Sequence, residues 1–170
     1  MRQAILLPSP LGEILATAQE NQLTGVYFSG GRYVPEDWTP GESCQALEQT
    51  REWLARYFAG EALPALPPLR LTGTPFCRTV WELLLDIPYG TVITYGQLAR
   101  QVEERTGRRA APRSVGQAVG HNPVSILVPC HRVVGAGGTL TGYGGGLERK
   151  AWLLCREGVP LTGGIDKSLR

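Results

Sequence analysis

The first sixty residues alternate between short apolar runs and polar turns, a pattern that predicts a small β-sheet. Apolar and β-branched residues dominate three segments, which are residues 3–7, 12–18 and 22–28. Two turn-forming sequences, Pro8-Ser9-Pro10 and Asn21-Gln22, separate these segments. Because short consecutive strands joined by tight turns pair antiparallel, we expect one small antiparallel sheet.

Apolar residues at helical spacing follow the predicted strands. We expect a helix from about Ser43, which serves as its N-cap, to Phe58, and Gly60 ends it. Its apolar positions are Leu47, Leu54, Tyr57 and Phe58. Residues 61–73 then carry few charges and three prolines, each of which excludes helix at the residue before it. We therefore expect an extended linker there.

Helices dominate the next part of the chain. Thr74-Pro75, a cap followed by proline at the first helical position, opens a helix that runs to about Asp86. Its apolar stripe consists of Phe76, Val80, Leu83, Leu84 and Ile87. A β-branched segment at 91–94 leads into a helix at 95–102, and another helix is expected at 112–120. Because arginines lie in the turn between these two helices, the pair predicts a helix-turn-helix unit.

The last third of the chain breaks this helical pattern. Residues 126–134, ILVPCHRVV, form an apolar and strand-like run. Residues 135–146 contain seven glycines without the GxxxxGK[ST] order of a phosphate loop, so we interpret them as a flexible hairpin or wing. A final helix is expected at 147–156, with Gly158 as its C-cap.

These elements predict an α+β fold in two parts. The first part, residues 1–62, is a small antiparallel sheet with a helix. A linker at 63–73 leads to a mostly helical, winged helix-turn-helix domain at 74–160. We expect residues 161–170, which are polar and glycine-rich, to form a flexible tail.

The net charge of +2 is unevenly distributed. Residues 1–73 carry 5 basic and 8 acidic side chains, a net of −3, whereas residues 74–170 carry 12 basic and 7 acidic, a net of +5. The surplus is greatest from Arg100 to Arg113, where five arginines accompany two glutamates. A solvated loop would explain this segment as well, but the asymmetry favours a C-terminal half that binds a polyanion such as nucleic acid.

Composition excludes several other classes of protein. No apolar run approaches the roughly 18 residues that a membrane span requires, and the first apolar stretch is too short for a signal peptide. The four cysteines lie far apart, with no CxxC pair and no clustered histidines, at Cys44, Cys77, Cys130 and Cys155. This spacing argues against a zinc site and against a disulfide framework. We therefore expect a metal-free protein of the reducing cytoplasm.

Cys130 is the strongest candidate for chemistry. It follows a proline and directly precedes His131 and Arg132. A cysteine attacks as its thiolate, and we expect these two basic neighbours to lower the pKa of the thiol. A buried structural cysteine would suit the apolar surroundings, but it does not need two basic residues beside it.

Several motifs occur in the order found in one family. PCHRV around Cys130, GHNP at 120–123, the glycine segment with Tyr143, and Glu157-Gly158 together resemble the O6-alkylguanine-DNA alkyltransferases, also called methylated-DNA–protein-cysteine methyltransferases. The resemblance covers about residues 72–158, and it extends to the N-terminal third only in length and in strand–helix layout. It implies that the N-terminal part is ribonuclease-H-like.

The resemblance implies a single displacement reaction. Cys130 attacks the alkyl carbon on guanine O6 and keeps the alkyl group as a thioether, so each molecule acts once and needs no cofactor. His131 is the implied base and reaches the thiol through a water, while Glu157 holds the other imidazole nitrogen. Asn122 is implied to brace the turn around His131. Tyr95 is implied to protonate the departing guanine and to contact a backbone phosphate.

The resemblance also implies binding to duplex DNA, from whose minor groove the damaged guanine is flipped out. Arg113 would fill the gap that the flipped base leaves. Small residues behind it would let the helix approach the sugar-phosphate backbone, and they are Ser114, Gly116, Ala118 and Gly120. The connection before Arg113, EERTGRRAAP, is longer and richer in arginine than in the family. We expect a monomer; cooperative binding along DNA and activity on O4-alkylthymine stay open.

The flipped guanine needs a pocket, which the resemblance assigns to four further positions. Backbone groups of Cys130 and Val133 would contact the exocyclic amine. Tyr143 would line one face, and the Gly144 N–H would face O6. Lys150 either assists phosphate or loop contacts or is solvated at the surface.

Two other functions are compatible with parts of this sequence. A hydrolytic cysteine enzyme would pair Cys130 with His121, the chain's only other histidine, and would release a free thiol at each turnover. A non-catalytic protein would bind lesions or regulate transcription through its helix-turn-helix unit. Because lesion binders of this family lack the cysteine that is present here, the resemblance favours the alkyltransferase.

Overall fold

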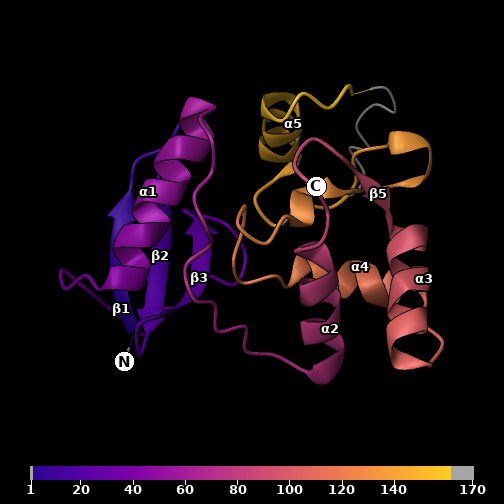
Figure 1. Cartoon of the computed structure of the whole chain (residues 1–170), viewed down its shortest axis with the longest axis horizontal. Helices are drawn as coiled ribbons and strands as arrows, with labels where there is room; N and C mark the ends of the chain where they lie inside the picture. The colour runs from indigo at the N-terminus through magenta and orange to yellow at the C-terminus, as the bar shows by residue number, and fades with distance from the viewer. Residues whose placement is uncertain (1, 162–170) are drawn as a thin grey trace. The chain divides into compact units, whose positions relative to one another are not determined.

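Strands come first along the chain and helices follow in the computed structural model, which describes residues 2–161 (Figure 1). The N-terminal unit consists of the residues up to Thr72 together with Pro123–Ser125. The C-terminal unit consists of Gly73–Asn122 and the described residues from Ile126 onward. The predicted α+β class is confirmed, whereas the domain limits at residues 62, 73 and 160 stay predictions. Beyond Leu161, the predicted flexible tail lies outside the described residues.

The N-terminal unit contains a four-stranded sheet in the order β3-β2-β1-β4. Antiparallel pairing joins β1 (Arg2–Leu7) to β2 (Ile14–Gln19) and β2 to β3 (Gln22–Phe28), as the alternating pattern predicted. The sequence did not reveal β4 (Trp38–Pro40), which pairs parallel with β1 at the edge of the sheet. Only three residues long and ending in proline, β4 has no apolar alternation by which it could be recognised.

The turn between β2 and β3 also caps the following helix, α1 (Gln45–Ala59). Glu20 and Asn21 have φ angles of 52° and 58°, as a two-residue hairpin turn of type I′ requires. The Asn21 side-chain oxygen accepts a hydrogen bond of 2.9 Å from the Ala46 N–H in the first turn of α1. The predicted N-cap, Ser43, is therefore wrong. Cys44 occupies the cap position without a side-chain bond, and the Ser43 hydroxyl donates to Glu48 instead.

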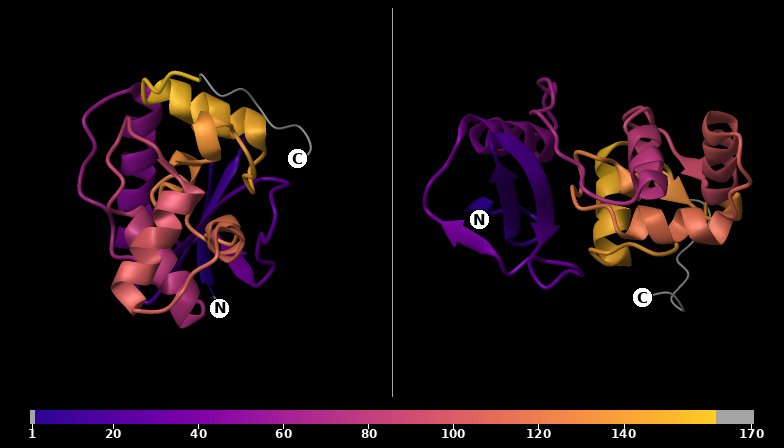
Figure 2. Two further views of the ribbon diagram at one scale, coloured as in Figure 1. Left: turned by 90° about the vertical axis from the view of Figure 1, so that its right-hand side faces the viewer. Right: turned by 90° about the horizontal axis from the view of Figure 1, so that it is seen from below.

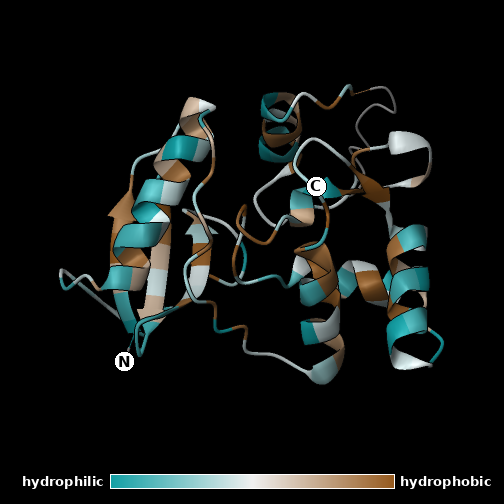
Figure 3. Cartoon of the chain, viewed as in Figure 1, coloured by the Kyte–Doolittle hydropathy of each residue, from teal (hydrophilic) through white to brown (hydrophobic). Residues whose placement is uncertain are grey.

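Helix α1 lies against one face of the sheet (Figures 1 and 2). Leu47, Leu54 and Tyr57 are buried, as their helical spacing predicted. Hydrophobic and hydrophilic residues are distributed around the helix, and its charged residues are exposed or half-buried (Figure 3). Gly60 ends the helix with a φ of 73°, a left-handed conformation that favours glycine.

Two later segments of the chain cover the outer edge of β3. The Leu23 N–H donates to the Pro68 carbonyl, and the Arg70 N–H donates back to the Leu23 carbonyl. Further along the strand, Val26 exchanges hydrogen bonds in the same way with the segment Pro123–Ser125. These bonds satisfy polar groups of an edge strand that would otherwise be open to another chain. Part of the segment that we predicted as a linker thus pairs with the sheet.

Three helices form the first layer of the C-terminal unit, α2 (Pro75–Leu84), α3 (Tyr95–Thr106) and α4 (Pro112–Gly120). The Thr74 hydroxyl accepts from the Cys77 N–H and Pro75 occupies the first helical position, as predicted for α2. The Trp81 indole donates to the Ala118 carbonyl at 2.8 Å and joins α2 to α4. The helices bury apolar positions of all three elements, namely Val80, Leu84, Leu98, Val102, Val115 and Val119.

Helix α3 extends one turn beyond the predicted end at about Val102. Its added turn, Glu103–Thr106, is polar and half-buried or exposed, so it lacks the apolar signal that marks a helix in the sequence. The Thr106 hydroxyl donates back to the Val102 carbonyl, and Gly107 ends the helix with a φ of 70°. The helix-turn-helix unit therefore has a tight connection, and its basic tip begins only at Arg108.

Residues 126–132, which we call the active-site turn, do not form the predicted strand. Ile126 has a φ of 71°, and residues 130–132 make one turn of 3-10 helix, η1 (Cys130–Arg132). Only β6 (Val133–Val134) is extended, and it pairs parallel with β5 (Ile93–Thr94). The prediction failed because Ile126, Leu127 and Val128 are buried in a turn. A short apolar run in the sequence does not distinguish a buried turn from a buried strand.

The chain returns through the glycine loop, residues 135–146, to α5 (Leu147–Arg156), whose limits match the prediction. A short 3-10 turn, η2 (Ala136–Gly138), lies within this loop. The C-cap is Glu157 and not Gly158 as predicted; Gly158 follows it with a φ of 81°. A second apolar cluster joins β6, the loop and α5 through Val134, Leu140, Leu147 and Leu154. This cluster anchors both ends of the loop.

Candidate active site

The active-site turn places Cys130 at the start of η1 with 6% of the residue exposed. The turn is closed by backbone hydrogen bonds from Cys130 to Val128 and from Arg132 to Pro129. The Asn122 amide donates to the Val128 carbonyl at 2.9 Å, and its side chain also hydrogen-bonds the Cys130 thiol. Asn122 therefore braces the turn, as predicted, through Val128 and Cys130.

The electrostatic surroundings of Cys130 differ from those we predicted. Burial raises the pKa of the Cys130 thiol, and this effect exceeds those of its polar neighbours. The hydrogen bond from Asn122, the positive charge of Lys150 and two backbone N–H groups act in the opposite direction and lower the pKa. The expectation that His131 and Arg132 lower it is wrong, because Arg132 and the Nε2 edge of His131 bind Glu157. The cation that acts on the sulfur is Lys150.

His131 is fully buried and pairs with Glu157. The distance from its Nε2 to Glu157 Oε2 is 2.5 Å, whereas its Nδ1 is buried without a hydrogen-bond partner. Burial lowers the pKa of His131, although the hydrogen bond and charge of Glu157 oppose this shift. When Nε2 carries the proton of the neutral ring, it donates to Glu157 and leaves the Nδ1 lone pair as an acceptor. The site therefore holds a neutral imidazole with one nitrogen free to accept a proton.

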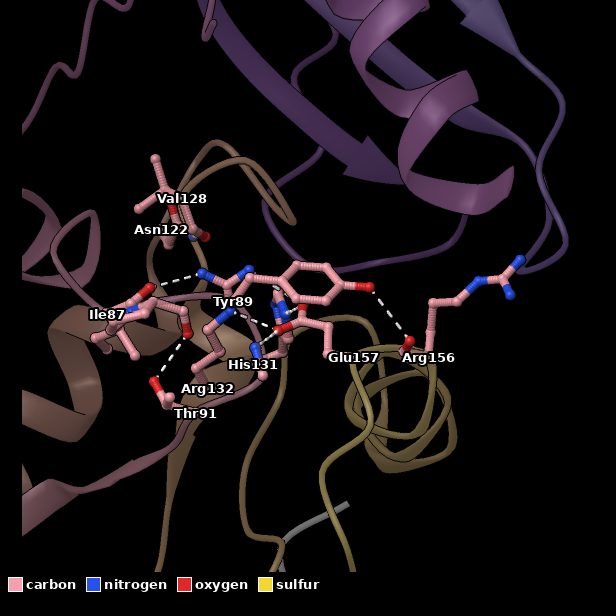
Figure 4. A network of polar contacts seen from close by, with 11 residues as sticks. Ile87, Tyr89, Thr91, Asn122, Val128, His131, Arg132, Arg156 and Glu157 are labelled. Carbon is pink, nitrogen blue, oxygen red and sulfur yellow. Dashed lines mark hydrogen bonds and ion pairs between the residues drawn. The ribbon is translucent and has the colours of Figure 1, made fainter. Parts of the chain in front are cut away.

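A guanidinium completes the surroundings of Glu157 (Figure 4). Arg132 donates from Nε to Oε1 at 2.7 Å and from Nη2 to Oε2 at 3.2 Å, and its Nη1 donates to the Ile87 carbonyl at 2.7 Å. The guanidinium also lies 5.7 Å from the centre of the Tyr89 ring. This two-point ion pair fixes the carboxylate that orients His131. Glu157 is thus a buried carboxylate that pairs with two side chains, and it is not a surface residue at a helix end.

The turn after α2 provides another partner of Glu157 that the sequence did not reveal. The Gly90 N–H donates to Glu157 Oε1 at 3.1 Å. Gly90 has a φ of 79°, and a Cβ added there would lie 3.1 Å from the Glu157 carbonyl oxygen. Both the conformation and the close approach favour glycine. The available signal in the sequence is Pro88-Tyr89-Gly90, a turn-forming run that follows the helix.

Lys150 is fully buried, so the predicted alternative of a solvated surface lysine is wrong. Its ammonium donates to the carbonyls of Val133, Thr141 and Gly142, at 2.6, 2.8 and 3.3 Å. Burial lowers the pKa of Lys150 to about 8, against the opposing charge of Cys130. Because the long stem of lysine reaches inward from α5, sequence position alone does not show on which side of the helix its charge lies.

Tyr95, at the start of α3, contacts the glycine loop and lies close to α4. Its hydroxyl donates to the Thr141 carbonyl at 3.1 Å, and the Lys150 nitrogen lies 5.8 Å from the centre of its ring. A Cβ added at Gly116 of α4 would lie 3.7 Å from the same ring, an ordinary contact distance, so the ring lies close to that helix. Burial raises the pKa of Tyr95, which keeps the hydroxyl protonated.

The remaining predicted positions fall into two groups. Arg113 and Ser114 are exposed in the first turn of α4, away from the buried polar cluster. Gly144 of the glycine loop approaches the end of α4, since a Cβ added to it would lie 3.8 Å from the Gly120 carbonyl. Val133 is buried in β6, and Tyr143 is half-buried in the loop. His121, the base that a hydrolytic enzyme would require, is exposed at the end of α4.

Three further properties of the described residues concern metal sites, membrane spans and disulfides. Between residues 2 and 161, no three histidine, cysteine or acidic side chains gather closely enough to hold a metal ion. Within the same range, every helix is too short or too polar to cross a membrane. All four cysteines of the chain are free thiols.

Comparison with known proteins places both parts of the chain in one family. The model of the 6-O-methylguanine DNA methyltransferase DNA-binding domain matches residues 75–159. The model of the ribonuclease-like domain of the same methyltransferases matches residues 4–71. The second match supports the ribonuclease-like N-terminal part that the resemblance implied.

Individual relatives agree with these matches over most of their length. The methylated-DNA–protein-cysteine methyltransferase of Mycolicibacterium paratuberculosis is 44% identical over 151 residues, which cover 88% of both chains. Its counterpart in Haemophilus influenzae is 40% identical over 94% of this chain and 87% of its own. The crystal structure of Mycobacterium tuberculosis O6-methylguanine methyltransferase superposes with a TM-score of 0.81 at 42% identity, covering 92% of this chain and 93% of its own. A crystal structure of Mycobacterium tuberculosis OGT in complex with DNA gives a TM-score of 0.82 at 41% identity, covering 91% and 92%. This chain therefore belongs to the family of 6-O-methylguanine DNA methyltransferases, the family that its sequence motifs predicted.

Proposed function

We propose that this protein repairs duplex DNA by transferring the alkyl group of O6-alkylguanine to Cys130, irreversibly and once per molecule. The observation that carries this proposal is the cluster around one buried thiol: Cys130 is held by Asn122 and lies next to His131, whose Nε2 binds Glu157 while Nδ1 stays available. Relatives that match most of this chain are named methylated-DNA–protein-cysteine methyltransferases. One relative, OGT of Mycobacterium tuberculosis, has been crystallised with DNA.

The reaction is a single displacement in which the S–C bond forms as the C–O6 bond breaks. The thiol proton leaves for His131 Nδ1 through a bridging water, and the electron pair of the C–O6 bond stays on guanine. Tyr95 gives a proton to the departing base and regains one from solvent. The thiol proton is thus in effect exchanged for the alkyl group. No cofactor takes part, because the substrate already carries the group that is transferred.

Three side chains prepare Cys130 for this step. His131 acts as the general base, since Nε2–H is committed to Glu157 and Nδ1 is the basic position that remains. Glu157 orients the ring and stabilises the imidazolium as it forms, which is the role of the third member of a nucleophile–base–orienter group. Asn122 holds the turn in place through Val128 and hydrogen-bonds the sulfur.

The pocket for the flipped guanine lies between η1, α3 and the glycine loop. Backbone groups of Cys130 and Val133 recognise the exocyclic amine, Tyr143 lines one face of the base, and the Gly144 N–H faces O6. Gly144 has no side chain that narrows this pocket, which leaves room for alkyl groups larger than methyl. Tyr95 reaches the pocket from the start of α3, where its hydroxyl bonds the loop at Thr141.

Helix α4 supplies the contact with DNA. We propose that it enters the minor groove and that Arg113 fills the gap left by the flipped base. Ser114 and Gly120 are exposed on α4 and leave room for the sugar-phosphate backbone. Gly116 is half-buried near the Tyr95 ring and is a further small residue on this helix. The protein acts as a monomer, and its four free thiols fit the reducing cytoplasm.

Mass spectrometry after incubation with duplex DNA that contains O6-methylguanine tests this proposal. Trypsin cuts after Arg113 and Arg132, so the peptide 114–132 carries Cys130 as its only cysteine. This peptide should gain one methylene unit in the wild type, with no more than one methyl group per protein molecule. Cys130→Ser should bind the same duplex and gain nothing. Transfer to Cys130→Ser, or release of more than one equivalent of repaired DNA per protein molecule, would refute the assignment.

A further inference from the structure

Lys150 is the least expected member of the buried cluster. It is 0% exposed, and its ammonium points at three backbone carbonyls, of β6 (Val133) and of the glycine loop (Thr141 and Gly142). An ammonium has three N–H groups and no acceptor, so three carbonyls match it fully. A neutral amine has only two N–H groups and would direct its lone pair at a carbonyl. This geometry is therefore that of the charged form.

This charge has no carboxylate partner. Among the ion pairs of residues 2–161, Arg132 and His131 share Glu157, and none involves Lys150. A buried charge without a counter-ion is costly, and proteins retain it where it has a use. The titratable groups that surround Lys150 are Cys130 and His131 of η1 and Tyr95 of α3. Of these, Cys130 is the one whose ionised form is stabilised by a nearby cation at neutral pH.

The positions of Arg132 and His131 leave this task to Lys150. The three nitrogens of Arg132 all donate hydrogen bonds, to Glu157 and to the Ile87 carbonyl, and the Nε2 edge of His131 faces Glu157. Lys150 bonds the carbonyl of Val133, the residue that directly follows η1, so its ammonium lies close to the turn that carries Cys130. The thiol thus has a neighbouring base that takes its proton and, in Lys150, a nearby cation that acts on the remaining charge.

We propose that Lys150 is a positioning residue, whose ammonium is the counter-ion of the Cys130 thiolate during alkyl transfer and whose hydrogen bonds hold the glycine loop against β6. This inference rests on the proposed function. The thiol proton goes to His131, and the negative charge on Sγ is stabilised by Lys150 until the S–C bond forms. The charge then passes to guanine with the C–O6 electron pair. Lys150 keeps its own proton throughout, and after transfer it faces a neutral thioether.

Removal of the Lys150 charge tests the first half of this proposal without DNA. The reaction of Cys130 with iodoacetamide, followed against pH, reports the fraction of thiolate. Lys150→Met should raise the midpoint by about one pH unit relative to the wild type, the size expected for one nearby charge. Arg100→Met removes an exposed charge from the same unit and should leave the midpoint unchanged. An unchanged midpoint in a folded Lys150→Met protein would overturn the proposal.

The pH dependence of the transfer rate separates an electrostatic role from a structural one. With free O6-benzylguanine as substrate, Lys150→Met should react about tenfold more slowly than the wild type below pH 8. This ratio should fall toward one above pH 8, where the wild type loses the Lys150 proton. Lys150→Arg, whose charge does not titrate, should keep its advantage over Lys150→Met at high pH. A ratio that is constant with pH would mean that Lys150 only supports the fold.

A second measurement needs no change at Lys150 and covers the case in which its variants do not fold. The chain has two lysines, Lys150 and Lys167, so a protein labelled on lysine gives two side-chain signals in an NMR titration, and Lys167→Arg assigns them. Because coupling is reciprocal, Lys150 should titrate at lower pH in Cys130→Ser than in the wild type. Equal titration in both would overturn the inference. A clear shift in a wild type that accepts no methyl from O6-methylguanine DNA would support the Lys150–Cys130 coupling while refuting the proposed function.

Discussion

In the N-terminal unit, α1 and its sheet bury almost only apolar side chains, whereas the surroundings of Cys130 bury a carboxylate, an imidazole, a guanidinium and an ammonium. Thr17 and Thr50 are the buried polar side chains of the described N-terminal residues, and each has a hydrogen-bond partner close in sequence. Around Cys130, Glu157 pairs with His131 and Arg132 across 26 and 25 residues of sequence.

This difference in buried side chains indicates that the N-terminal core mainly stabilises the fold, whereas the charged groups around Cys130 mainly serve the chemistry. Apolar burial stabilises the sheet and helix in proportion to the area removed from water. Burial of Glu157, Arg132 and Lys150 carries a desolvation cost that close pairing only offsets, so such groups are weak contributors to stability. The C-terminal unit retains them because they fix the tautomer of His131 and the charge that faces Cys130. Substitutions in the two regions should therefore fail in different ways.

Glu157→Gln compared with Leu54→Ala gives the largest expected contrast. Glu157→Gln removes the anion that orients His131, so transfer from free O6-benzylguanine should fall by about 10²- to 10³-fold per folded molecule. It also leaves Arg132 buried without its counter-ion, which should cost about 3–5 kcal/mol of stability. Leu54→Ala opens a cavity under α1 and should cost about 2–5 kcal/mol. Its rate per folded molecule should match that of the wild type.

Urea unfolding gives the stabilities in this comparison, and titration of reactive Cys130 gives the number of competent molecules. A Leu54→Ala protein whose competent molecules react as slowly as Glu157→Gln would show that the two regions do not separate stability from chemistry.

The pH dependence of the free energy of unfolding should show that the buried Lys150 charge destabilises the folded protein. Burial lowers the pKa of Lys150 to about 8 in the folded protein, against 10.5 for an exposed lysine. Between these values the unfolded chain binds more protons than the folded protein, so stability rises with pH across this window, and below pH 8 the cost is full. The free energy of unfolding of the wild type should therefore rise by up to about 3 kcal/mol relative to Lys150→Met between pH 8 and 10.5.

This difference is measured by urea unfolding of the two proteins at matched pH, which cancels the titration of their shared groups. Arg100→Met serves as the control with one exposed charge removed, and its stability should run parallel to that of the wild type. If the curves for Lys150→Met and the wild type also run parallel, the Lys150 ammonium is not desolvated in the folded protein.

The sequence predicted the elements whose signals are local and missed the contacts that come from distant residues. The limits of α4 and α5 follow from Pro112 at a helix start and from the glycine after a helix end, and both were correct. The N-cap of α1 was wrong because Asn21, 25 residues before its partner, supplies the bond. The strand predicted within 126–134 is also wrong at residues 126–132, because burial and a hydrogen bond from Asn122 hold these residues in a turn.

The candidate site shows the same limit. Cys130, His131, Asn122 and Glu157 were recognised from motifs and lie together in the structure. The motifs did not show which carboxylate Arg132 binds, or that Lys150 reaches inward across the glycine loop. Side-chain direction in a turn and on a helix depends on tertiary packing, which no local pattern encodes.

Arg113→Ala extends the contrast to the surface of the C-terminal unit. Because Arg113 is exposed and touches no member of the buried cluster in any described contact, its loss should leave stability and the reaction with free O6-benzylguanine unchanged. Repair of duplex DNA should fall by about tenfold to a hundredfold, since the flipped base is no longer replaced in the stack at a cost of a few kcal/mol. Arg56→Ala on α1 is the matched control. Equal losses with duplex and with the free base would remove the flipping role of Arg113.

The smallest expected effect concerns the tip between α3 and α4. Gly107 turns the chain with a φ of 70°, the Thr106 hydroxyl accepts from the Arg108 N–H, and Glu103 accepts from the Ala110 N–H. This ordered turn holds Arg108 and Arg109 exposed, and no ion pair of residues 2–161 involves either of them. Their charges are therefore available to bind DNA phosphates beside the minor-groove position that we propose for α4.

Arg108→Gln with Arg109→Gln should weaken binding to duplexes of any sequence by the same factor, because bonds to phosphate carry no sequence information. The slope of log binding constant against log salt concentration should decrease by about 0.9 for each phosphate that the variant no longer neutralises. Fluorescence anisotropy at several salt concentrations between about 50 and 200 mM gives this slope, with Arg51→Gln on α1 as the control. An unchanged slope would mean that the basic tip lies away from DNA and that the positive charge of this unit acts through α4 alone.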